Sequence, residues 1–390
     1  MPAIDVPVSV VVPTLDAGSD AALFLAAFER QAGIRELELV VADSGSTDGT
    51  RERFAAAADV ALDIPAGEFG HGRTRNDAFA ASSGEVVVMM VQDALLLGPF
   101  ALRDLVLELL SNDRAAAVSA RHVPRSDADL FGAFNVVSHY RALWWEGRRA
   151  HPSDPLRRRA DAGVDDVCAA IRRSVWEQGI QFRDVDFGED LDFGMRAVSA
   201  GWTIGLSDTV AVAHSHTRDA PYHFRRSAAD RLHVAQLVGD DAVCRSASTG
   251  EVAEIISAGR ALLRGVSAAA AADSHDRLSD QLHRVVEVVT SRATAKAPLG
   301  GQLALLDEFF AGLGGGAVRD DVTASLRDEF VALLEWPLLV EFAEVQRGVS
   351  AAAASDFAAK LAASVVGRSV GDRLRSQDSP AERERLLVGV

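Results

Sequence analysis

Apolar runs and helical stretches alternate along the first two hundred residues of the chain. The predicted strands, all short and rich in aliphatic residues, are Val8–Val12, Glu36–Ala42, Val60–Ile64 and Val86–Val91. The predicted helices between them are Ala21–Gln31, Thr50–Ala57 and Thr74–Ser82, the last after a glycine-broken loop at Gly67–Gly72. Strands that alternate with helices in this way predict an α/β fold with a mostly parallel sheet. Ligands of such sheets bind at the carboxyl ends of the strands.

The pattern changes in the second half of the chain. The next predicted elements are a helix at Leu191–Ala200 and strands at Thr203–Leu206 and Val210–Ala213. Beyond Pro221, alanine-rich stretches separated by glycine breaks predict mainly helix. An apolar helical stripe runs from Leu303 to Leu313. Core packing or a subunit interface is its ordinary explanation, and a partner or membrane-surface helix is the alternative.

Composition limits the class of protein. With 390 residues, 48% hydrophobic and 25% charged, the chain is long enough for two or three folded domains. The net charge of −16 argues against general binding to nucleic acid or anionic membrane, because both are polyanions. Cys168 and Cys244 are isolated, so no disulfide framework or structural zinc site is expected. With no signal peptide and no apolar window of about 18 residues, we expect a cytoplasmic protein, soluble or peripheral at the inner face of the membrane.

Acidic residues follow two of the predicted strands. Asp43 ends the second strand and is followed by Ser-Gly-Ser, a segment suited to hydrogen bonds with a base or a ribose. Turn and cap chemistry is its ordinary explanation. Asp93 follows the run Val86–Val91 and could hold a hard cation at a pocket floor, although a strand-terminating turn is the simpler explanation.

Two later groups are also candidates for chemistry. Glu189 and Asp190 open the helix at Leu191–Ala200, where acidic residues are favoured by the helix dipole, and one of them could be a general base. His214 and His216 follow the last predicted strand and could bind a divalent metal, although a structural histidine is more common.

Taken in order, these elements resemble the family 2 glycosyltransferases, inverting enzymes with the GT-A fold, over roughly residues 6 to 235. The parts that resemble the first strand and the nucleotide-binding signature of the family are Val8–Thr14 and Val41–Thr50. The resemblance is closer to a rhamnosyltransferase-like branch, through the HG-x-TRN, QDA and AAIRRSVW elements of Phe69–Asn76, Gln92–Ala94 and Ala169–Trp176. The set is completed by Gly188–Leu191, His214–His216 and Phe224–Arg226.

The resemblance implies a GT-A catalytic domain, Rossmann-like with a mostly parallel central sheet, over residues 1–235. Residues 236–390 are left as a mainly α-helical C-terminal region for oligomerisation or partner binding. The implied reaction moves a sugar from a dTDP- or UDP-sugar to a hydroxyl of a glycan or lipid-linked acceptor, with L-rhamnose from dTDP-rhamnose as the branch-level expectation. A second copy of the chain is a further expected partner, and nucleic acid is not.

The resemblance also implies roles for individual residues. Asp190, beside Glu189, would be the general base. Asp93 and His214 would hold Mn²⁺ or Mg²⁺ against the diphosphate, with Mn²⁺ favoured because imidazole suits transition metals. The residues expected to contact the donor are Pro13, Thr14, Asp16, Asp43, Ser44, His71, Arg75, Gln92 and Asp93.

The chain departs from the family pattern in two places. Most of the wider family begins an Asp-x-Asp pair at the position where this chain has Val91. The rhamnosyltransferase-like branch also lacks this first aspartate. Val167 and Cys168 stand where the branch has an asparagine that bears on acceptor recognition. The alternative function is a non-catalytic sugar-nucleotide-binding or scaffold protein, against which the acidic pair and His214 count. A nucleotidyltransferase is disfavoured because Thr14–Gly18 is not a glycine- and arginine-rich loop.

Overall fold

The computed structural model describes residues 3–65, 67–140, 143, 147–185 and 187–238, with Asp356, Lys360, Ala363, Ser364 and Arg368. Most of the predicted helical region 236–390, including the stripe from Leu303 to Leu313, therefore lies outside the described residues. The chain divides into two compact units. The first unit comprises Met1–Ser126, His139–Ser215 and Leu237–Gly239, and the second comprises Asp127–Ser138, His216–Gln236 and Asp240–Val390. The predicted boundary at residue 235 stays a prediction.

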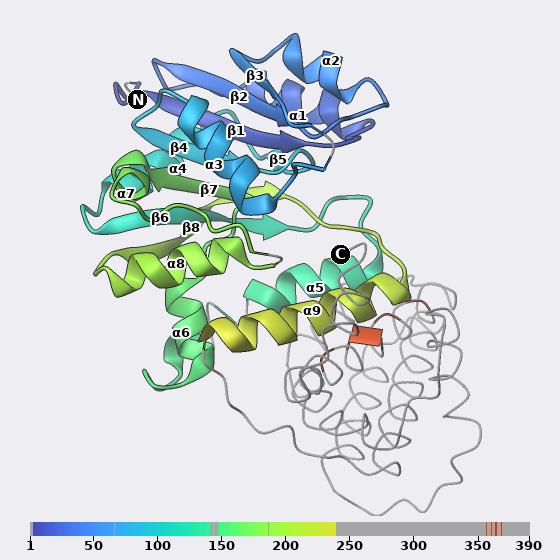
Figure 1. Ribbon diagram of the computed structural model, residues 1–390, viewed down its shortest axis with the longest axis vertical. Helices are drawn as coiled ribbons and strands as arrows, with labels where there is room; N and C mark the ends of the chain where they lie inside the picture. Colours follow the sequence, from blue (N-terminus) through green and yellow to red (C-terminus); the bar gives the residue numbers. More distant parts are fainter. Residues whose placement is uncertain are drawn as a thin grey trace, which may run out of the picture. The chain divides into compact units, whose positions relative to one another are not determined.

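The first two hundred residues form alternating strands and helices, as the sequence predicts (Figure 1). The strands are β1 Val8–Thr14, β2 Leu37–Asp43, β3 Val60–Asp63, β4 Val86–Met90, β5 Leu95–Leu96, β6 Ala115–Val123, β7 Cys168–Arg172 and β8 Thr203–Ala213. The α-helices are α1 Asp20–Glu29, α2 Thr50–Ala55, α3 His71–Ala81, α4 Ala101–Leu110, α5 Leu130–Tyr140, α6 Pro155–Ala162, α7 Arg173–Glu177, α8 Glu189–Ser199 and α9 Ala220–Val238. None of the described helices is long and apolar enough to cross a membrane.

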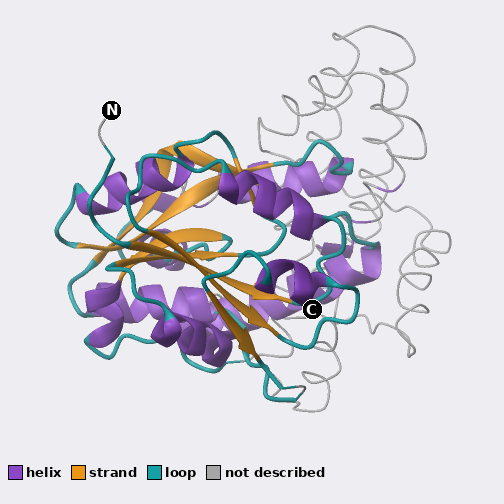
Figure 2. Cartoon of the chain, turned by 90° about the horizontal axis from the view of Figure 1, so that it is seen from above, coloured by secondary structure: helices purple, strands orange, loops and turns teal. Residues whose placement is uncertain are grey.

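The described strands form one sheet in the order β3-β2-β1-β4-β7-β6-β8-β5. The pairs β1–β2, β1–β4, β2–β3 and β6–β8 are parallel, whereas β7 is antiparallel to both of its neighbours and β5 is antiparallel to β8. The predicted α/β fold with a mostly parallel sheet is thus confirmed. Helices lie on both faces of the sheet in Figure 2.

Each face of the sheet has its own hydrophobic core. Val10 and Val12 of β1 belong to the core that contains Phe24 of α1, together with residues of α2 and α4. Val11 points the other way and belongs to the core that contains Phe79 of α3, together with residues of α7 and α8. Because successive side chains of a strand alternate between faces, a strand covered on both sides is apolar at most positions. This explains the valines of Val8–Val12, where the one polar residue, the buried Ser9, donates its hydroxyl to the Glu38 carboxylate.

The strand order places the candidate site. From β1 the chain builds one side of the sheet with β2 and β3 and then returns to the other side with β4. This change of direction is the topological switch point at which α/β sheets bind ligands, at the carboxyl ends of the strands. Thr14 and Asp43 are opposite each other at the ends of β1 and β2, and Asp93 follows the end of β4.

The structure corrects two predicted boundaries. Helix α3 begins at His71 instead of Thr74, because Gly72 is required for packing and does not break the helix: a Cβ there would lie 2.0 Å from the Arg183 carbonyl oxygen. The two strands predicted between residues 203 and 213 are one strand, β8, with a register shift against β6. At the shift, the buried Ser207 hydroxyl accepts a hydrogen bond from the Val210 amide (2.8 Å).

Candidate active site

The first part of the candidate site is the turn that follows β2. The Asp43 carboxylate accepts hydrogen bonds from the Thr14 hydroxyl at 2.8 Å and from the Gly45 amide at 3.1 Å. It also accepts from the Ser46 amide and hydroxyl, at 2.8 and 2.6 Å. Burial would raise the pKa of this carboxyl, but the hydrogen bonds outweigh burial and hold the pKa below its usual range. Asp43 therefore joins the ends of β1 and β2 as a buried carboxylate.

Further contacts join the loop after β1 to the loop after β2. The Asp16 amide donates to Ser46 Oγ (3.0 Å), and the Asp16 carboxylate accepts from the Thr47 amide (2.7 Å). Asp16 has a φ of 43°, in the left-handed region that aspartate tolerates better than most residues. Next to this pair of loops, the buried Ser44 hydroxyl has no hydrogen-bond partner in the described part of the chain. A ligand or a water molecule is expected to satisfy it.

Gln92 ties the loop after β4 to the loop after β1. Its Oε1 accepts from the Leu15 amide and its Nε2 donates to the Leu15 carbonyl oxygen, both at 2.8 Å. A carboxamide can form both bonds at once, whereas a carboxylate has no hydrogen to donate. Gln92 was expected to contact the donor. The structure shows it holding the loop after β1 through the Leu15 backbone, and a direct contact with a donor stays a prediction.

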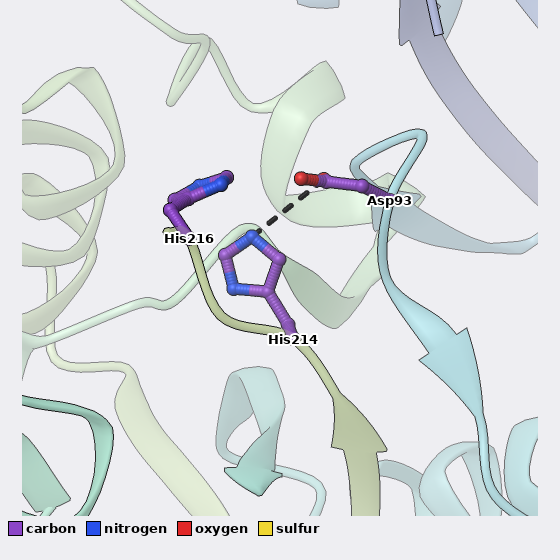
Figure 3. Close-up of side chains that lie close together, drawn as sticks. All are labelled: Asp93, His214 and His216. Atoms are coloured by element: carbon purple, nitrogen blue, oxygen red, sulfur yellow. Dashed lines mark ion pairs between the residues drawn. The ribbon is translucent and has the colours of Figure 1, made fainter. Parts of the chain in front are cut away.

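Three residues that could bind a metal gather after β4 and β8 (Figure 3). Asp93, His214 and His216 each have a ligand atom within 4.8 Å of the others. His214 Nε2 lies 3.6 Å from Asp93 Oδ1. Strand β5 brings these two residues together, because Leu95 pairs with Ala213 at the end of β8. A carboxylate with imidazoles is a donor set that Mn²⁺ accepts, so these residues form a possible metal site.

Arg125, which no sequence motif marks, holds the backbone around this site. Its Nη1 donates to the Asp93 carbonyl oxygen (3.2 Å), and its Nη2 pairs with Asp20 (2.8 Å). Its own amide donates to Ser215 Oγ (3.1 Å). Arg125 thus connects the segment that carries Asp93 to the segment that carries His214.

The second part of the candidate site is a buried cluster of carboxylates around Arg75. Arg75, on α3, forms ion pairs with Asp166 and with Glu189, whose Oε1 lies 2.6 Å from Arg75 Nη1. It also donates to the His71 carbonyl oxygen (3.1 Å). Burial would lower the pKa of Arg75, but the nearby carboxylates raise it, so the guanidinium stays charged. In the structure the Arg75 guanidinium binds carboxylates. The expected contact of Arg75 with a diphosphate stays a prediction.

Asp190 lies in the first turn of α8, directly after Glu189. Burial raises the pKa of the Asp190 carboxyl well above its usual range. The neighbouring carboxylates of Asp166, Glu189 and Asp165 raise this pKa further. The Leu191 amide, which donates to Asp190 Oδ1 at 2.7 Å, acts in the opposite direction. A carboxylate with a raised pKa accepts a proton more readily, which is the property that a general base needs.

Asp165 belongs to a neighbouring network that the sequence motifs miss. The Tyr140 hydroxyl donates to Asp165 Oδ2 (2.6 Å), and His122 Nε2 lies 3.2 Å from Asp165 Oδ1. Burial would raise the pKa of Asp165, but His122 and its other partners hold it well below the usual range. The His122 ring packs edge-on against the His214 ring, with centroids 5.1 Å apart. The network therefore extends from the possible metal site towards the carboxylate cluster.

Comparisons with known proteins decide the family. A family model described as glycosyl transferase family 2 matches residues 9–179. The O-antigen chain rhamnosyltransferase WbaN of Salmonella anatum is 30% identical over 226 residues, which cover 56% of this chain and 69% of WbaN. The chain belongs to glycosyl transferase family 2.

Further relatives of this family 2 glycosyltransferase carry similar names. The O-antigen chain rhamnosyltransferase RfbN of Salmonella typhimurium strain LT2 is 29% identical over 230 residues, covering 56% of this chain and 69% of RfbN. Among solved structures, the mannosyltransferase PcManGT from Pyrobaculum calidifontis in complex with GDP-Man and Mn²⁺ is 19% identical. It covers 89% of each chain with a TM-score of 0.49.

The family assignment confirms the predicted resemblance, and it identifies the protein as a glycosyltransferase with an α/β fold of the GT-A type. The matched range includes Thr14, Asp43, Arg75 and Asp93 and ends before the acidic pair of α8. The structure brings the predicted donor residues Thr14, Asp16, Asp43, Ser44 and Gln92 together in one set of loops. It places His71 and Arg75, also predicted to contact the donor, beside the acidic pair instead. The roles of these residues remain proposals.

Proposed function

We propose that this glycosyltransferase transfers L-rhamnose from dTDP-rhamnose to a hydroxyl of a glycan or lipid-linked acceptor, with inversion at the anomeric carbon. The observation that carries the sugar and the acceptor class is the 30% identity to an O-antigen chain rhamnosyltransferase, over 69% of that protein. A polysaccharide under assembly is therefore the proposed destination of the sugar. The reaction would take place on the cytoplasmic side of the membrane.

The loops at the switch point are proposed to bind the nucleoside diphosphate. Asp43 holds the turn after β2 rigid, and Asp16 and Gln92 hold the neighbouring loops in register with it. Pro13 and Thr14 form the end of β1 beside this turn. The Ser44 hydroxyl, which has no hydrogen-bond partner among the described residues, supplies a group that a ligand can bind. Rigid loops reduce the ordering that donor binding would otherwise require.

Asp93 and His214 are proposed to hold Mn²⁺ or Mg²⁺, with His216 as a further ligand. Their ligand atoms are close enough for one ion, and the mixed carboxylate and imidazole donors fit Mn²⁺. A divalent cation at this position would neutralise charge on the departing diphosphate. Arg125 keeps the backbone of Asp93 in place through its contact with the carbonyl oxygen.

Asp190 is proposed to be the general base. Its carboxylate takes the proton of the acceptor hydroxyl while the acceptor oxygen bonds to the anomeric carbon. The bond from that carbon to the diphosphate oxygen breaks on the opposite face of the sugar, so the configuration inverts. The raised pKa of Asp190 supports this role, because the carboxyl holds the proton that it removes more firmly than an ordinary aspartate would.

A donor screen followed by a transfer assay tests this function. The full chain with Mn²⁺ is heated with dTDP-rhamnose, dTDP-glucose, UDP-glucose or GDP-mannose at equal concentrations. We expect dTDP-rhamnose to raise the unfolding temperature most, because the donor that binds the folded state most tightly stabilises it most. Release of dTDP is then measured with and without a panel of octyl glycosides, and acceptor-dependent release is expected. Stabilisation by a donor without any turnover would favour the non-catalytic alternative. A larger shift with another donor would overturn the choice of sugar.

A further inference from the structure

The charges around Asp190 are unbalanced. Asp166, Glu189 and Asp190 contribute three carboxylates, and Arg75 lies among them as one cation with ion pairs to Asp166 and Glu189. The side chains of these ion pairs are between 9% and 12% exposed, so water screens their charges weakly. Ionisation of all three carboxylates therefore leaves excess negative charge in a buried place, which is unfavourable.

We propose that Asp166, held by Arg75, is a positioning residue that keeps a negative charge beside Asp190 and so enables Asp190 to accept the proton of the acceptor hydroxyl. This inference rests on the proposed role of Asp190 as the base. Asp166 itself is not proposed to touch the substrate. Its contribution is a fixed charge at a fixed place.

Groups from several elements face Asp190, and they differ in how their charge is balanced. Glu189 precedes it on α8 and shares Arg75 with Asp166. His71, on α3, lies with Nδ1 3.9 Å from the Glu189 carboxylate. Asp165 has its own partners, His122 and the hydroxyl of a tyrosine, which stabilise its charge. Asp166 therefore shares its neutralising cation with a second carboxylate, whereas Asp165 does not.

The guanidinium of Arg75 is suited to this arrangement. Its Nη2 contacts Asp166 while its Nη1 contacts Glu189 and donates to the His71 carbonyl oxygen. A planar fork can hold two carboxylates at once, whereas the ammonium of a lysine is a compact charge at the end of a flexible chain. The fork fixes Asp166 and Glu189, and Asp190 lies near enough to the same guanidinium to raise the pKa of Arg75.

A double-mutant cycle in thermal unfolding tests the proposal without any substrate or metal. Asp190→Asn replaces one carboxyl of this cluster with a neutral amide, and we expect it to raise the unfolding temperature of the full chain at pH 7.5 by about 3 °C. In the Asp166→Asn background the same change should give half of this gain or less, because the repelling charge is gone. Equal gains in both backgrounds would overturn the proposal.

Two further variants keep this test decisive. Arg75→Lys should enlarge the gain from Asp190→Asn, because an ammonium lacks the planar fork that holds Asp166 at Nη2 and Glu189 at Nη1. If Asp166→Asn does not fold, an unchanged gain in Arg75→Lys overturns the proposal. Asp192→Asn is the matched control. Asp192 is a buried carboxylate of the same helix that pairs with Arg196 at 2.7 Å, outside the cluster, so the gain should not change in its background.

The pH profile links the proposal to catalysis. With dTDP-rhamnose, Mn²⁺ and the octyl glycoside that supports turnover, kcat/KM should fall at low pH as Asp190 becomes protonated. Asp166→Asn should shift this fall by about one unit towards lower pH, because a nearby negative charge is removed. Asp166→Glu should restore the wild-type position. If no transfer is detected but the unfolding cycle shows coupling between Asp166 and Asp190, the proposed function fails and the coupling of the two charges stands. If the enzyme is active and Asp166→Asn leaves the pH profile unchanged, the proposal is overturned.

Discussion

Asp43 and Asp190 show how two aspartates of one protein acquire opposite properties. Asp43 accepts hydrogen bonds from Thr14, Gly45 and Ser46, so its pKa is lowered and it stays ionised. Asp190 is surrounded by other carboxylates, so its pKa is raised. Titratable groups whose surroundings separate their pKa values in this way commonly divide the work of binding and proton transfer. The structure is consistent with a binding role for Asp43 and a proton-transfer role for Asp190.

Asp190→Asn should reduce sugar transfer by about 10²- to 10⁴-fold, because an amide cannot accept the acceptor proton. Nucleotide binding should change little, since the loops that carry Asp43 are not altered. Transfer is measured as acceptor-dependent dTDP release, and binding by calorimetry with dTDP. Asp192→Asn serves as the control and should retain activity. Wild-type turnover in Asp190→Asn would remove this residue from the reaction.

Asp93→Ala and His214→Ala should each weaken the binding of dTDP-rhamnose in the presence of Mn²⁺ by about tenfold or more, because each removes a proposed metal ligand. Binding of the free nucleoside thymidine, which has no phosphate, should be unaffected. Both affinities are measured by calorimetry, and activity is measured in excess EDTA. Full turnover of the wild type in EDTA would exclude the metal from the scheme.

At the scale of elements, the loops at the carboxyl ends of the strands are joined into one support. Ser44 donates its amide to the Thr14 carbonyl oxygen (2.9 Å), Asp16 joins the same two loops, and Gln92 adds the loop after β4. Elsewhere in the fold, glycines let backbone segments approach closely: a Cβ at Gly72 of α3 would lie 2.0 Å from the Arg183 carbonyl oxygen.

Gln92→Glu should weaken donor binding several-fold with little loss of stability. The carboxylate cannot donate to the Leu15 carbonyl oxygen and adds a negative charge next to the proposed diphosphate site. The measurement is the affinity for dTDP-rhamnose beside the unfolding temperature. Gln31, whose side chain donates to the Gly98 carbonyl oxygen away from these loops, gives the matched control Gln31→Glu. Equal affinities of Gln92→Glu and the wild type would contradict the positioning role.

Gly194→Ala should destabilise the packing of α8 against α6. A Cβ at Gly194 would lie 1.8 Å from the Ala162 carbonyl oxygen, which is backbone and cannot move aside alone. Overpacking of this kind costs about 1–3 kcal/mol, so the unfolding temperature should fall by several degrees. Val198→Ala, at an exposed position of the same helix, should have little effect. An unchanged unfolding temperature for Gly194→Ala would show that the two helices can separate freely.

At the scale of the whole molecule, residues far apart in the chain join in the second compact unit. Lys360, one of the buried polar residues, pairs with Asp129 at 2.7 Å and with Asp356 at 2.6 Å. His223 of α9 lies in the same unit, with its ring against Phe131 of α5. A buried cation held by two carboxylates is a specific contact between the C-terminal region and the residue that precedes α5.

The second unit should become less stable as the pH falls. Burial and the charge of Lys360 lower the pKa of His223 to about 4, only partly offset by nearby carboxylates such as Asp129. Between about pH 6.5 and pH 4, His223 is protonated in the unfolded chain but stays neutral in the folded protein. The free energy of unfolding therefore decreases as the pH falls through this range. The unfolding temperature of His223→Gln should therefore fall less between pH 7 and pH 5 than that of the wild type. Parallel losses in the two proteins would contradict the assignment.

The sequence by itself determined the class of fold, the family motifs and the order of the residues at the strand ends. These follow from local rules: apolar runs form buried strands, and Asp43 or Asp93 directly after such a run must lie at a carboxyl end. The alanine-rich strand β6 was not predicted, because small residues suited to a position buried on both faces have weak strand propensity.

Tertiary structure alone decided which residues meet. The pairing of β5 with β8 brings Asp93 to His214, and the fold lets Arg75 of α3 form ion pairs with Glu189 of α8 and with Asp166, which precedes β7. No local pattern contains this information, because contacts between distant segments depend on strand order and on the burial that it creates. Charge effects depend on the same burial. The sequence identified Asp190 as acidic, and only the folded protein gives it the raised pKa that a base requires.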